Sequence, residues 1–195
     1  MGIRMATAAD TAELLAIYGQ YINTSITFEY TLPSEETFST RITGILAEYP
    51  YLVWQEEGKI LGYAYAHRHM ERAAYQWNAE LSVYLDRAAR GRGLGRRLYG
   101  ALMELLTMQG ILTAHALVTS PNPPSQALHE AMGFRLAAVH RLAGFKAGQW
   151  HDVLWYEKVL APRKSDPVPP KPLSALPRSR VAEVLETFSA PCEGL

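Results

Sequence analysis

The sequence predicts a mixed α/β (α+β) fold in which a mostly antiparallel central sheet is flanked by helices. Two strand-like runs follow one another directly between residues 51 and 68, as in a hairpin. Strand and helix patterns alternate only after residue 77, whereas a doubly wound parallel sheet would alternate throughout. The 195 residues are 48% hydrophobic, which is the average of folded domains, so disorder of the whole chain is excluded.

The first part of the chain combines the apolar periods of helices and strands. Asp10 is a candidate helix cap, because its carboxylate can accept hydrogen bonds from the first free backbone N–H groups. In order, we expect a strand at 3–6, a helix after Asp10 that reaches residue 22, a helix from Pro33 to just before Pro50, and strands at 51–55 and 60–68 about the turn Glu57-Gly58.

The later part of the chain is expected to begin with a strand at 77–85, in which polar and apolar residues alternate. A glycine-rich turn leads from this strand into a helix with an apolar stripe of leucines. The stripe is Leu94, Leu98, Leu102 and Leu105, and the further elements are a strand at 112–119, a helix at 125–132, and strands at 134–141 and 150–160.

Proline usage divides the chain near residue 160. Seven of the twelve prolines lie in residues 161–195, and proline cannot continue a helix or an interior strand because it lacks an N–H donor. We therefore expect a domain at 1–160 and a proline-rich tail at 161–195. Residues 180–188 have a weak helical spacing that would let the tail dock, and the alternative is a disordered tail without a role.

Charge and cysteine content exclude several classes of protein. Nineteen basic and nineteen acidic residues cancel, so no net field attracts nucleic acid or an anionic membrane. No apolar run reaches the ~20 residues that span a bilayer, and the N-terminus lacks a signal-peptide pattern. The single cysteine, Cys192, permits no internal disulfide. We expect a cytoplasmic protein that binds neither nucleic acid nor membrane.

The segment Arg90-Gly91-Arg92-Gly93-Leu94-Gly95, between a strand and an amphipathic helix, is the most informative about function. Its glycines allow a tight bend and close approach of a ligand to the backbone. N–H groups at a helix start, with two arginines, suit a pyrophosphate-sized anion, and the alternative is a basic surface turn. A dinucleotide fingerprint is excluded because no carboxylate lies at 110–120, and a Walker loop because Gly-Lys-Ser/Thr is absent.

Arg90, Gly93 and Gly95 resemble the Arg/Gln-x-x-Gly-x-Gly/Ala pattern of the GNAT N-acetyltransferase superfamily. A second set, Asn122, Ser125, His129 and Gly133-Phe134, follows the spacing of that superfamily downstream. The resemblance implies the acetyltransferase fold, with acetyl-CoA as co-substrate. The residues implied to bind acetyl-CoA are Val83, Tyr84 and Leu85, whose backbone would pair with the pantetheine arm like an added strand, the loop Arg90, Gly91, Arg92, Gly93, Leu94 and Gly95, and Asn122 and Ser125.

Three further segments narrow the resemblance to the phosphinothricin N-acetyltransferase family, which includes methionine sulfone and sulfoximine acetyltransferases. They are residues 72–84, residues 143–153 and the stretch from Ile22 to Phe28, and the proline-rich run 167–172 is also similar. The resemblance covers about residues 3–172, and it implies a homodimer. Residues 178–195 match nothing in that family, so their role stays open.

Acetyl transfer to an amine requires removal of a proton from the ammonium and stabilisation of the thiolate that leaves. Glu80 is the candidate general base, because desolvation in an apolar strand makes a carboxylate a stronger base. The alternative is an exposed carboxylate on a half-buried strand. His129 lies where the superfamily usually has a tyrosine acting as general acid, and the phosphinothricin enzymes also have histidine there. A helix-surface histidine without a role is the alternative.

Four residues are candidates for binding the acceptor. Arg72 and Tyr75 precede the strand of Glu80, and arginine can hold an amino acid's carboxylate with two hydrogen bonds. Lys146 is a candidate for a phosphinate, sulfone or sulfoximine oxygen, and Phe28 for a wall of the pocket. Plain packing or a solvated charge is the alternative for the latter two. The histidines show no metal-ligand spacing beyond the weak His67-x-His69, so no metal is expected.

The resemblance therefore implies direct transfer of an acetyl group from acetyl-CoA to the α-amine of an L-amino-acid-like substrate. Phosphinothricin, methionine sulfoximine and methionine sulfone are the implied acceptors. Cys192 lies in the tail, where no nucleophile is expected, which favours transfer without an acyl-enzyme. Two alternatives stay open: a different amine acceptor (a polyamine, an aminoglycoside or a protein N-terminus), and a non-catalytic acetyl-CoA-binding module.

Overall fold

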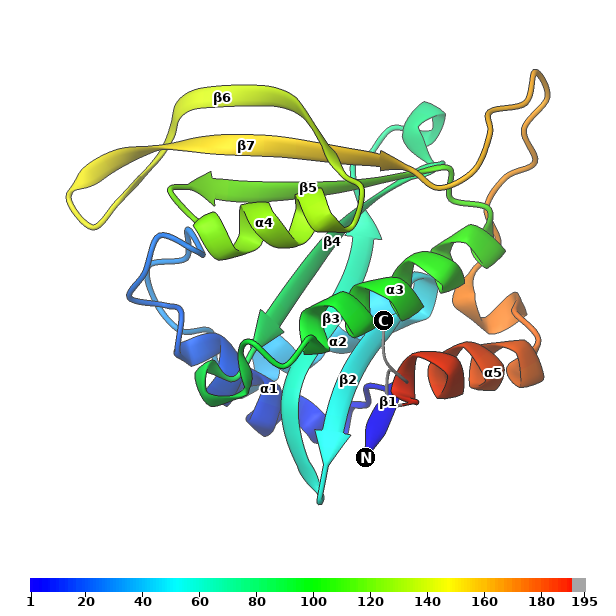
Figure 1. The fold of residues 1–195 in the computed structure, drawn as a ribbon, viewed down its shortest axis with the longest axis horizontal. Coiled ribbons are helices and arrows are strands. Elements are labelled where there is room, and N and C mark those ends of the chain that lie inside the picture. The colour runs from blue at the N-terminus through cyan, green and yellow to red at the C-terminus, as the bar shows by residue number, and fades with distance from the viewer. Residues whose placement is uncertain (191–195) are drawn as a thin grey trace.

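A computed structural model describes residues 1–190 and shows a seven-stranded sheet with helices on both faces (Figure 1). The strand order is β1-β2-β3-β4-β5-β7-β6. Among these described strands, β4 and β5 are parallel and the other neighbouring pairs are antiparallel. The predicted fold class, a mixed and mostly antiparallel sheet flanked by helices, is confirmed.

The elements follow the expected order along the chain. The strands are β1 (Gly2–Met5), β2 (Tyr51–Glu56), β3 (Lys59–Arg68), β4 (Asn78–Leu85), β5 (Thr113–Ser120), β6 (Arg135–Lys146) and β7 (Gln149–Val159). The α-helices are α1 (Thr11–Gly19), α2 (Glu35–Glu48), α3 (Leu94–Gln109), α4 (Pro123–Ala131) and α5 (Arg178–Ser189).

The start of α1 differs from the expectation. The Asp10 carboxylate does not cap this helix, because it binds the Arg4 guanidinium and accepts from the Thr7 N–H at 2.7 Å. It thereby closes a short 3-10 turn, Ala8–Asp10, that precedes α1. Arg4 lies six residues away in β1, so the local sequence pattern did not reveal this pairing.

Two ends also differ in extent. Helix α1 stops at Gly19 rather than at residue 22, because the chain continues in tight turns in which the Tyr21 N–H donates to Tyr18 O at 2.9 Å. Strand β6 runs on to Lys146 rather than to residue 141, because it pairs with β7 as far as a tight turn at Ala147-Gly148. Both residues of that turn have positive φ, which suits a two-residue hairpin connection.

The sheet separates two hydrophobic cores. On one face, α3 packs with α5 against small residues such as Ala64 and Ala66 of β3. On the other face, α1 and α2 cover the intervening residues of the same strand, including Tyr63. Because side chains alternate along a strand, β3 contributes small residues to one core and aromatic residues to the other.

The proline-rich part of the chain leads to a docked helix. Helix α5 lies beside α3 and β1, and Leu176 and Val184 are buried in the core that α3 forms (Figure 1). The Ile3 N–H donates to Ser189 Oγ at 2.6 Å, so α5 also closes the N-terminal strand. Residues 161–190 are thus attached to the rest of the described chain by both apolar and polar contacts.

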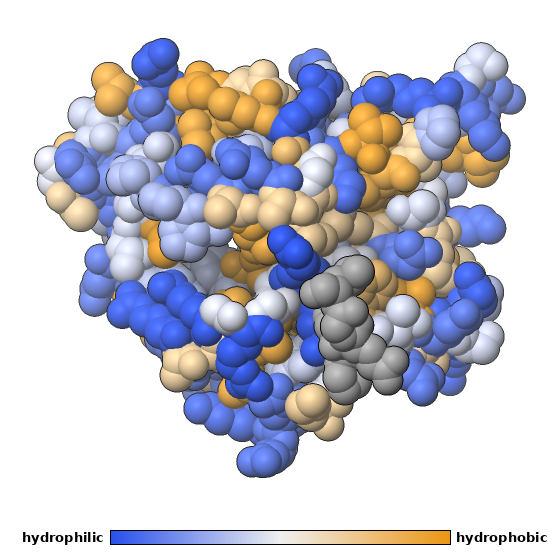
Figure 2. Space-filling model, in the orientation of Figure 1, coloured by the Kyte–Doolittle hydropathy of each residue, from blue (hydrophilic) through white to orange (hydrophobic). Residues whose placement is uncertain are grey.

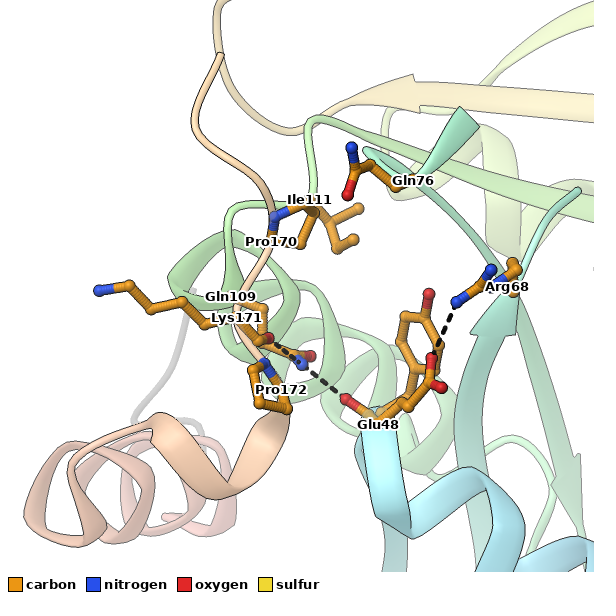
Figure 3. Close-up of a pocket in the computed structure, with 9 residues that line it drawn as sticks. Glu48, Arg68, Gln76, Gln109, Ile111, Pro170, Lys171 and Pro172 are labelled. Atoms are coloured by element: carbon orange, nitrogen blue, oxygen red, sulfur yellow. Dashed lines mark hydrogen bonds and ion pairs between the residues drawn. The ribbon is translucent and has the colours of Figure 1, made fainter. Parts of the chain in front are cut away.

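A buried glutamine fastens the segment that precedes α5. Gln109, at the end of α3, donates from Nε2 to Glu48 O at 2.7 Å and to Lys171 O at 2.9 Å. Figure 3 shows these two bonds of the Gln109 side chain, and the Lys171 N–H donates back to Gln109 O at 2.7 Å. These bonds border a hollow of about 310 Å³ between the end of α2 and the proline-rich segment, where Arg68 also pairs with Glu48.

In the part of the chain that the structure describes, no helix has the length and apolar character needed to cross a membrane.

Candidate active site

Strands β4 and β5 pair at their beginnings and then diverge. The paired residues are Asn78 with Thr113, Ala79 with Ala114, and Glu80 with His115. Both strands continue, to Leu85 and Ser120, without pairing further with each other. Glu80 therefore lies at the closed end of a V-shaped gap, and from residue 81 onward the edge of β4 that faces β5 is unpaired. Val83, Tyr84 and Leu85 lie on this edge, as an added strand would require.

A cavity of about 690 Å³ lies at the open end of this gap. Its lining comes from the loop before α3, the start of α4 and the segment after α1, and includes Tyr21, Ile26, Arg90, Gly93, Asn122 and Ser125. Figure 2 shows the molecule hollowed between α4 and the start of α3, with apolar atoms inside the hollow. A smaller space between β4 and β5 shares Ile26, Val83, Asn122 and Ser125 with this cavity.

The glycine-rich loop presents open backbone to the cavity. Gly91 and Gly93 have φ values of 77° and 76°, and nothing lies within 4 Å of the position that a Cβ would occupy on either residue. Gly93 is also the N-cap of α3, so the first free N–H groups of that helix follow it. Gly95 differs, because a Cβ there would contact Leu128 at 3.5 Å. The loop therefore combines an anion-binding helix start with empty space.

The basic residues of the loop have different partners. Arg90 lines the cavity, and its guanidinium lies 5.1 Å from the centre of the Tyr21 ring. Arg92 instead pairs with Glu56 of β2 at 2.8 Å, and this hydrogen bond lowers the pKa of the Glu56 carboxyl. Arg96, which the sequence interpretation did not include, lines the cavity from the first turn of α3. A cation in the first turn of a helix is unfavourable, because the helix dipole is positive there, unless an anion binds nearby. The position of Arg96 in the sequence could therefore have indicated an anion site.

Asn122, Ser125 and His129 come together at the start of α4. Asn122 Oδ1 accepts from the Ser125 N–H at 3.4 Å and so caps the helix, which leaves its amide NH₂ for a ligand. His129 is 2% exposed, and its Nδ1 lies 2.7 Å from Ser125 O. Since a carbonyl oxygen only accepts, Nδ1 carries a proton. His129 Nε2 then accepts from the Tyr99 hydroxyl at 3.3 Å.

Burial lowers the pKa of His129, so its imidazole is neutral at neutral pH. Burial raises the pKa of Tyr99, so its phenol keeps its proton. Both side chains line the space between β4 and β5. The geometry thus presents a neutral His129–Tyr99 pair, and not the charged imidazolium that a simple general acid would require. Tyr99 was not predicted, because its place on the apolar face of α3 resembles an ordinary core position.

The face of the sheet under α1 and α2 carries a row of aromatic side chains next to Glu80. Tyr63 and Tyr65 of β3 stack on Tyr51 with ring centres 5.7 and 4.9 Å away. A second cavity, of about 370 Å³, is lined by these tyrosines, by His67 and by the Glu29–Arg41 ion pair. His67 lies opposite Glu80 in the β3–β4 register. Glu80 is therefore adjacent both to this cavity and to the gap between β4 and β5.

Lys146 and Phe28 both contact other parts of the chain. The Lys146 ammonium is buried and donates to three backbone oxygens, those of Ile22, Thr27 and Glu29, at 2.6–2.8 Å. With all three N–H groups used, it has no donor for a substrate oxygen in this arrangement, and burial lowers its pKa. The Phe28 ring occupies the space beside Gly144 where a Cβ would be. The two residues fasten the segment 22–29 to the β6–β7 hairpin.

Arg72 and Tyr75 lie on the exposed turn before β4. Among the described residues, no hydrogen bond joins the side chains of Arg72 and Tyr75 to Lys146, whose three donors are used by Ile22, Thr27 and Glu29. Cys192 lies outside the described residues. Within residues 1–190, no group of three or more His, Cys, Asp or Glu side chains is placed to hold a metal ion.

Comparison with known proteins identifies the family of this chain. Residues 3–155 match the model of the acetyltransferase (GNAT) domain. The chain belongs to the GNAT acetyltransferase family. The expected enzyme class, an acyltransferase that uses acetyl-CoA, is thereby confirmed.

Relatives and solved structures agree with the family. A phosphinothricin N-acetyltransferase of Streptomyces viridochromogenes is 36% identical over 88% of this chain and 92% of its own. An L-methionine sulfoximine/L-methionine sulfone acetyltransferase of Salmonella typhimurium is 30% identical over 80% of this chain and 93% of its own. The crystal structure of a phosphinothricin acetyltransferase from Sinorhizobium meliloti in complex with acetyl-CoA has a TM-score of 0.81, at 34% identity, over 88% of this chain and 97% of its own.

Proposed function

We propose that this GNAT acetyltransferase moves the acetyl group of acetyl-CoA directly to the α-amine of an L-amino-acid-like substrate. The acceptors that the names of its relatives suggest are phosphinothricin, methionine sulfoximine and methionine sulfone. One observation carries the proposal: Glu80 lies where the gap between β4 and β5 closes, next to the tyrosine-lined cavity. A base at this point can reach an amine on one side and a thioester on the other.

The open loop suits the pyrophosphate of acetyl-CoA. Gly91 and Gly93 leave room for phosphate oxygens, and Arg90 and Arg96 supply positive charge. The unpaired edge of β4 from Val83 to Leu85 would hold the pantetheine arm, and Asn122 and Ser125 would contact it from α4. When bound, acetyl-CoA supplies an activated acetyl group and a thiolate that leaves.

Glu80 would take a proton from the acceptor ammonium, since only the neutral amine is a nucleophile. The Tyr99 hydroxyl lines the gap and has a single proton, which it donates to His129 Nε2 in the structure. When acetyl-CoA is bound, this proton would turn from His129 to the sulfur, where negative charge develops. Proton donation would then fall to Tyr99, and His129 would position its hydroxyl. Removing His129 would then leave the buried Tyr99 hydroxyl without its partner.

Arg72 and Tyr75 remain the proposed contacts for the acceptor's carboxylate. Lys146 and Phe28 would act on the acceptor indirectly, by holding the segment 22–29 that contributes Ile26 to the acetyl-CoA cavity and Glu29 to the tyrosine-lined cavity. A polycationic acceptor is less well supported. Glu29 is the carboxylate in the lining of the tyrosine-rich cavity, and it is already paired with Arg41 at 2.5 Å.

We also propose that residues 1–160 form the catalytic unit, that the enzyme is a homodimer and that it works in the cytoplasm. The edge strand β6 and the start of β7 expose several large apolar side chains, and such an edge favours pairing. They are Leu136, Val139, Leu142, Phe145 and Trp150. Light scattering of the purified protein tests the dimer, and a monomer at micromolar concentration would contradict it.

The function is tested by release of free CoA thiol from acetyl-CoA over a panel of amines. The panel holds phosphinothricin, methionine sulfone, methionine sulfoximine, methionine, glutamate, spermidine and an aminoglycoside. We expect turnover with the three amino acids whose side chains end in a tetrahedral, oxygen-rich group. Turnover with spermidine or the aminoglycoside alone would overturn the acceptor assignment and keep the acetyl donor.

A variant separates an enzyme from a binding module. Glu80→Gln should lower kcat about 100-fold or more while CoA binds with unchanged affinity. If wild-type protein and this variant both bind CoA and neither turns over any amine, the protein is a binding module.

A further inference from the structure

Two histidines face the carboxylate of Glu80, and a third histidine stacks on one of them. His67 Nε2 lies 3.8 Å from Glu80 Oε1, and His69 Nδ1 lies 3.5 Å from Glu80 Oε2. His115, paired with Glu80 across the β4–β5 ladder, stacks on His69 with ring centres 4.0 Å apart and planes 9° apart. Each carboxylate oxygen therefore faces a different imidazole, and one of these imidazoles is held in place by a third.

The two imidazoles next to Glu80 differ in their access to water. The side chain of His67 is 39% exposed, whereas that of His69 is 6% exposed. His67 Nδ1 lies 2.9 Å from Arg68 O, a group that only accepts, so Nδ1 carries the proton of the neutral ring. His67 Nε2 then turns a lone pair toward Glu80. This arrangement is suited to receiving a proton from Glu80 and releasing one to water.

The other titratable groups around Glu80 do not take part near neutral pH. Burial, with a further contribution from His69, lowers the pKa of His115 to about 4, and Asn78 Oδ1 accepts a hydrogen bond from its Nε2. Glu157 of β7 and Arg163 act on His115 in opposite directions. Burial raises the pKa of Tyr65 and of Tyr99, so both phenols stay protonated. Of the titratable groups at this point, Glu80, His67 and His69 remain, and only His67 of the two histidines is open to water.

We propose that His67 carries to solvent the proton that Glu80 takes from the acceptor. His69, stacked on His115, is a positioning residue whose Nδ1 lies 3.5 Å from the other oxygen of the Glu80 carboxylate. This inference rests on the proposed function. An ammonium that becomes an amide nitrogen loses two protons as the N–C bond forms and the C–S bond breaks. One proton ends on the thiol of CoA and the other reaches water, and Glu80 must be deprotonated again before the next turnover.

The test compares His67→Ala, His69→Ala and His140→Ala in the full-length protein. His140 is an exposed histidine that stacks on Trp155, with ring centres 4.6 Å apart, and serves as the matched control. Thiol release with methionine sulfone is measured at low buffer concentration and again with increasing imidazole. We expect His67→Ala to lose about tenfold in kcat at low buffer and to recover as imidazole rises, because free imidazole replaces the missing proton carrier.

His69→Ala should lose activity without recovery, since its site is closed to imidazole, and His69→Gln should restore part of it. Wild-type protein and His140→Ala should not respond to imidazole. Wild-type rates in His67→Ala, or a loss that imidazole does not change, would overturn the relay and leave the proposed function intact.

A second measurement tests the pairing of Glu80 with His67 and His69, and it can be made even if no amine is acetylated. The ring ¹H–¹⁵N resonances of the six histidines are recorded at fixed pH in wild type and in Glu80→Gln. Those of His67 and His69 should shift and that of His140 should not. Unshifted His67 and His69 would overturn the proposed pairing, whereas absence of turnover with every amine would overturn the proposed function alone.

Discussion

Helix α3 has glycine before its first turn, at Gly93, and again in its middle, at Gly100, and the surroundings of these two residues differ. Nothing in the described chain lies within 4 Å of a Cβ placed on Gly93. At Gly100 the same position is occupied by the ring of Phe188 from α5. One glycine leaves space for a ligand, whereas the other leaves space for a helix of the same chain. A glycine can therefore mark a binding site only where no other part of the chain fills the space that its missing side chain leaves.

Removal of residues 161–195, which include the helix that fills the space at Gly100, should cause the largest loss of stability. A chain that ends at residue 160 loses the buried Leu176 and Val184 together with Phe188. We expect it to lose about 5 kcal/mol of stability, or about 10–20 °C in Tm. It should still unfold cooperatively and bind CoA within about twofold, because the cavity lining ends at Leu128.

Calorimetry and CoA titration check this expectation. Phe188→Ala, which removes one contact and keeps the helix, serves as a milder version if the truncated chain does not fold. Loss of CoA binding in a folded truncated protein would contradict the separation between the two regions and the proposed unit at 1–160.

Substitution of each glycine by alanine should separate an effect on CoA binding from an effect on stability. Gly93→Ala places a Cβ in the open space at a φ of 76°, which costs about 1–2 kcal/mol, and it should raise the Kd of CoA about tenfold or more. Gly100→Ala forces the Phe188 ring to move and should cost about 1–3 kcal/mol, partly offset by better helix propensity. Its Kd for CoA should not change.

Gly58→Ala is the matched control for backbone strain. Gly58 has a φ of 81° and an equally open Cβ position, but it lies in the turn between β2 and β3. It should lower Tm as Gly93→Ala does and leave CoA binding unchanged, as measured by isothermal titration. Equal weakening of CoA binding by both variants would mean that strain, and not lost space, causes the effect.

The smallest predicted effect is a loss of stability in acid, which arises from His115 of β5. Folding lowers the pKa of His115 to about 4, mainly through burial, from about 6.5 in an unfolded chain. The unfolded state therefore binds more protons between these values, so stability is complete above about pH 6.5 and falls as the pH drops toward 4. After a discount for solvent screening of a half-exposed ring, the loss is about 1 kcal/mol, or about 2–4 °C in Tm.

His115→Gln should flatten this pH dependence, and His140→Gln, on an exposed ring, should not. Thermal unfolding at several pH values between 4 and 7 measures both slopes. An unchanged slope in His115→Gln would place the acid sensitivity elsewhere in the molecule.

The order and type of the elements, the mostly antiparallel sheet and the glycine loop could be predicted from the sequence alone. These features depend on apolar periods, prolines and glycines that act within a few residues. The loop was also recognisable because its residues are adjacent in the chain, and the weak helical spacing at 180–188 did correspond to a docked helix.

The contacts between side chains that are distant in the sequence could not be predicted in this way. Lys146 binds oxygens more than a hundred residues away in the chain, and Arg92 turns to Glu56 rather than to the loop's ligand space. The stack of His69 on His115 exists because β3, β4 and β5 are neighbours in the sheet. Such contacts depend on strand order and register, and local periodicity does not encode either of them.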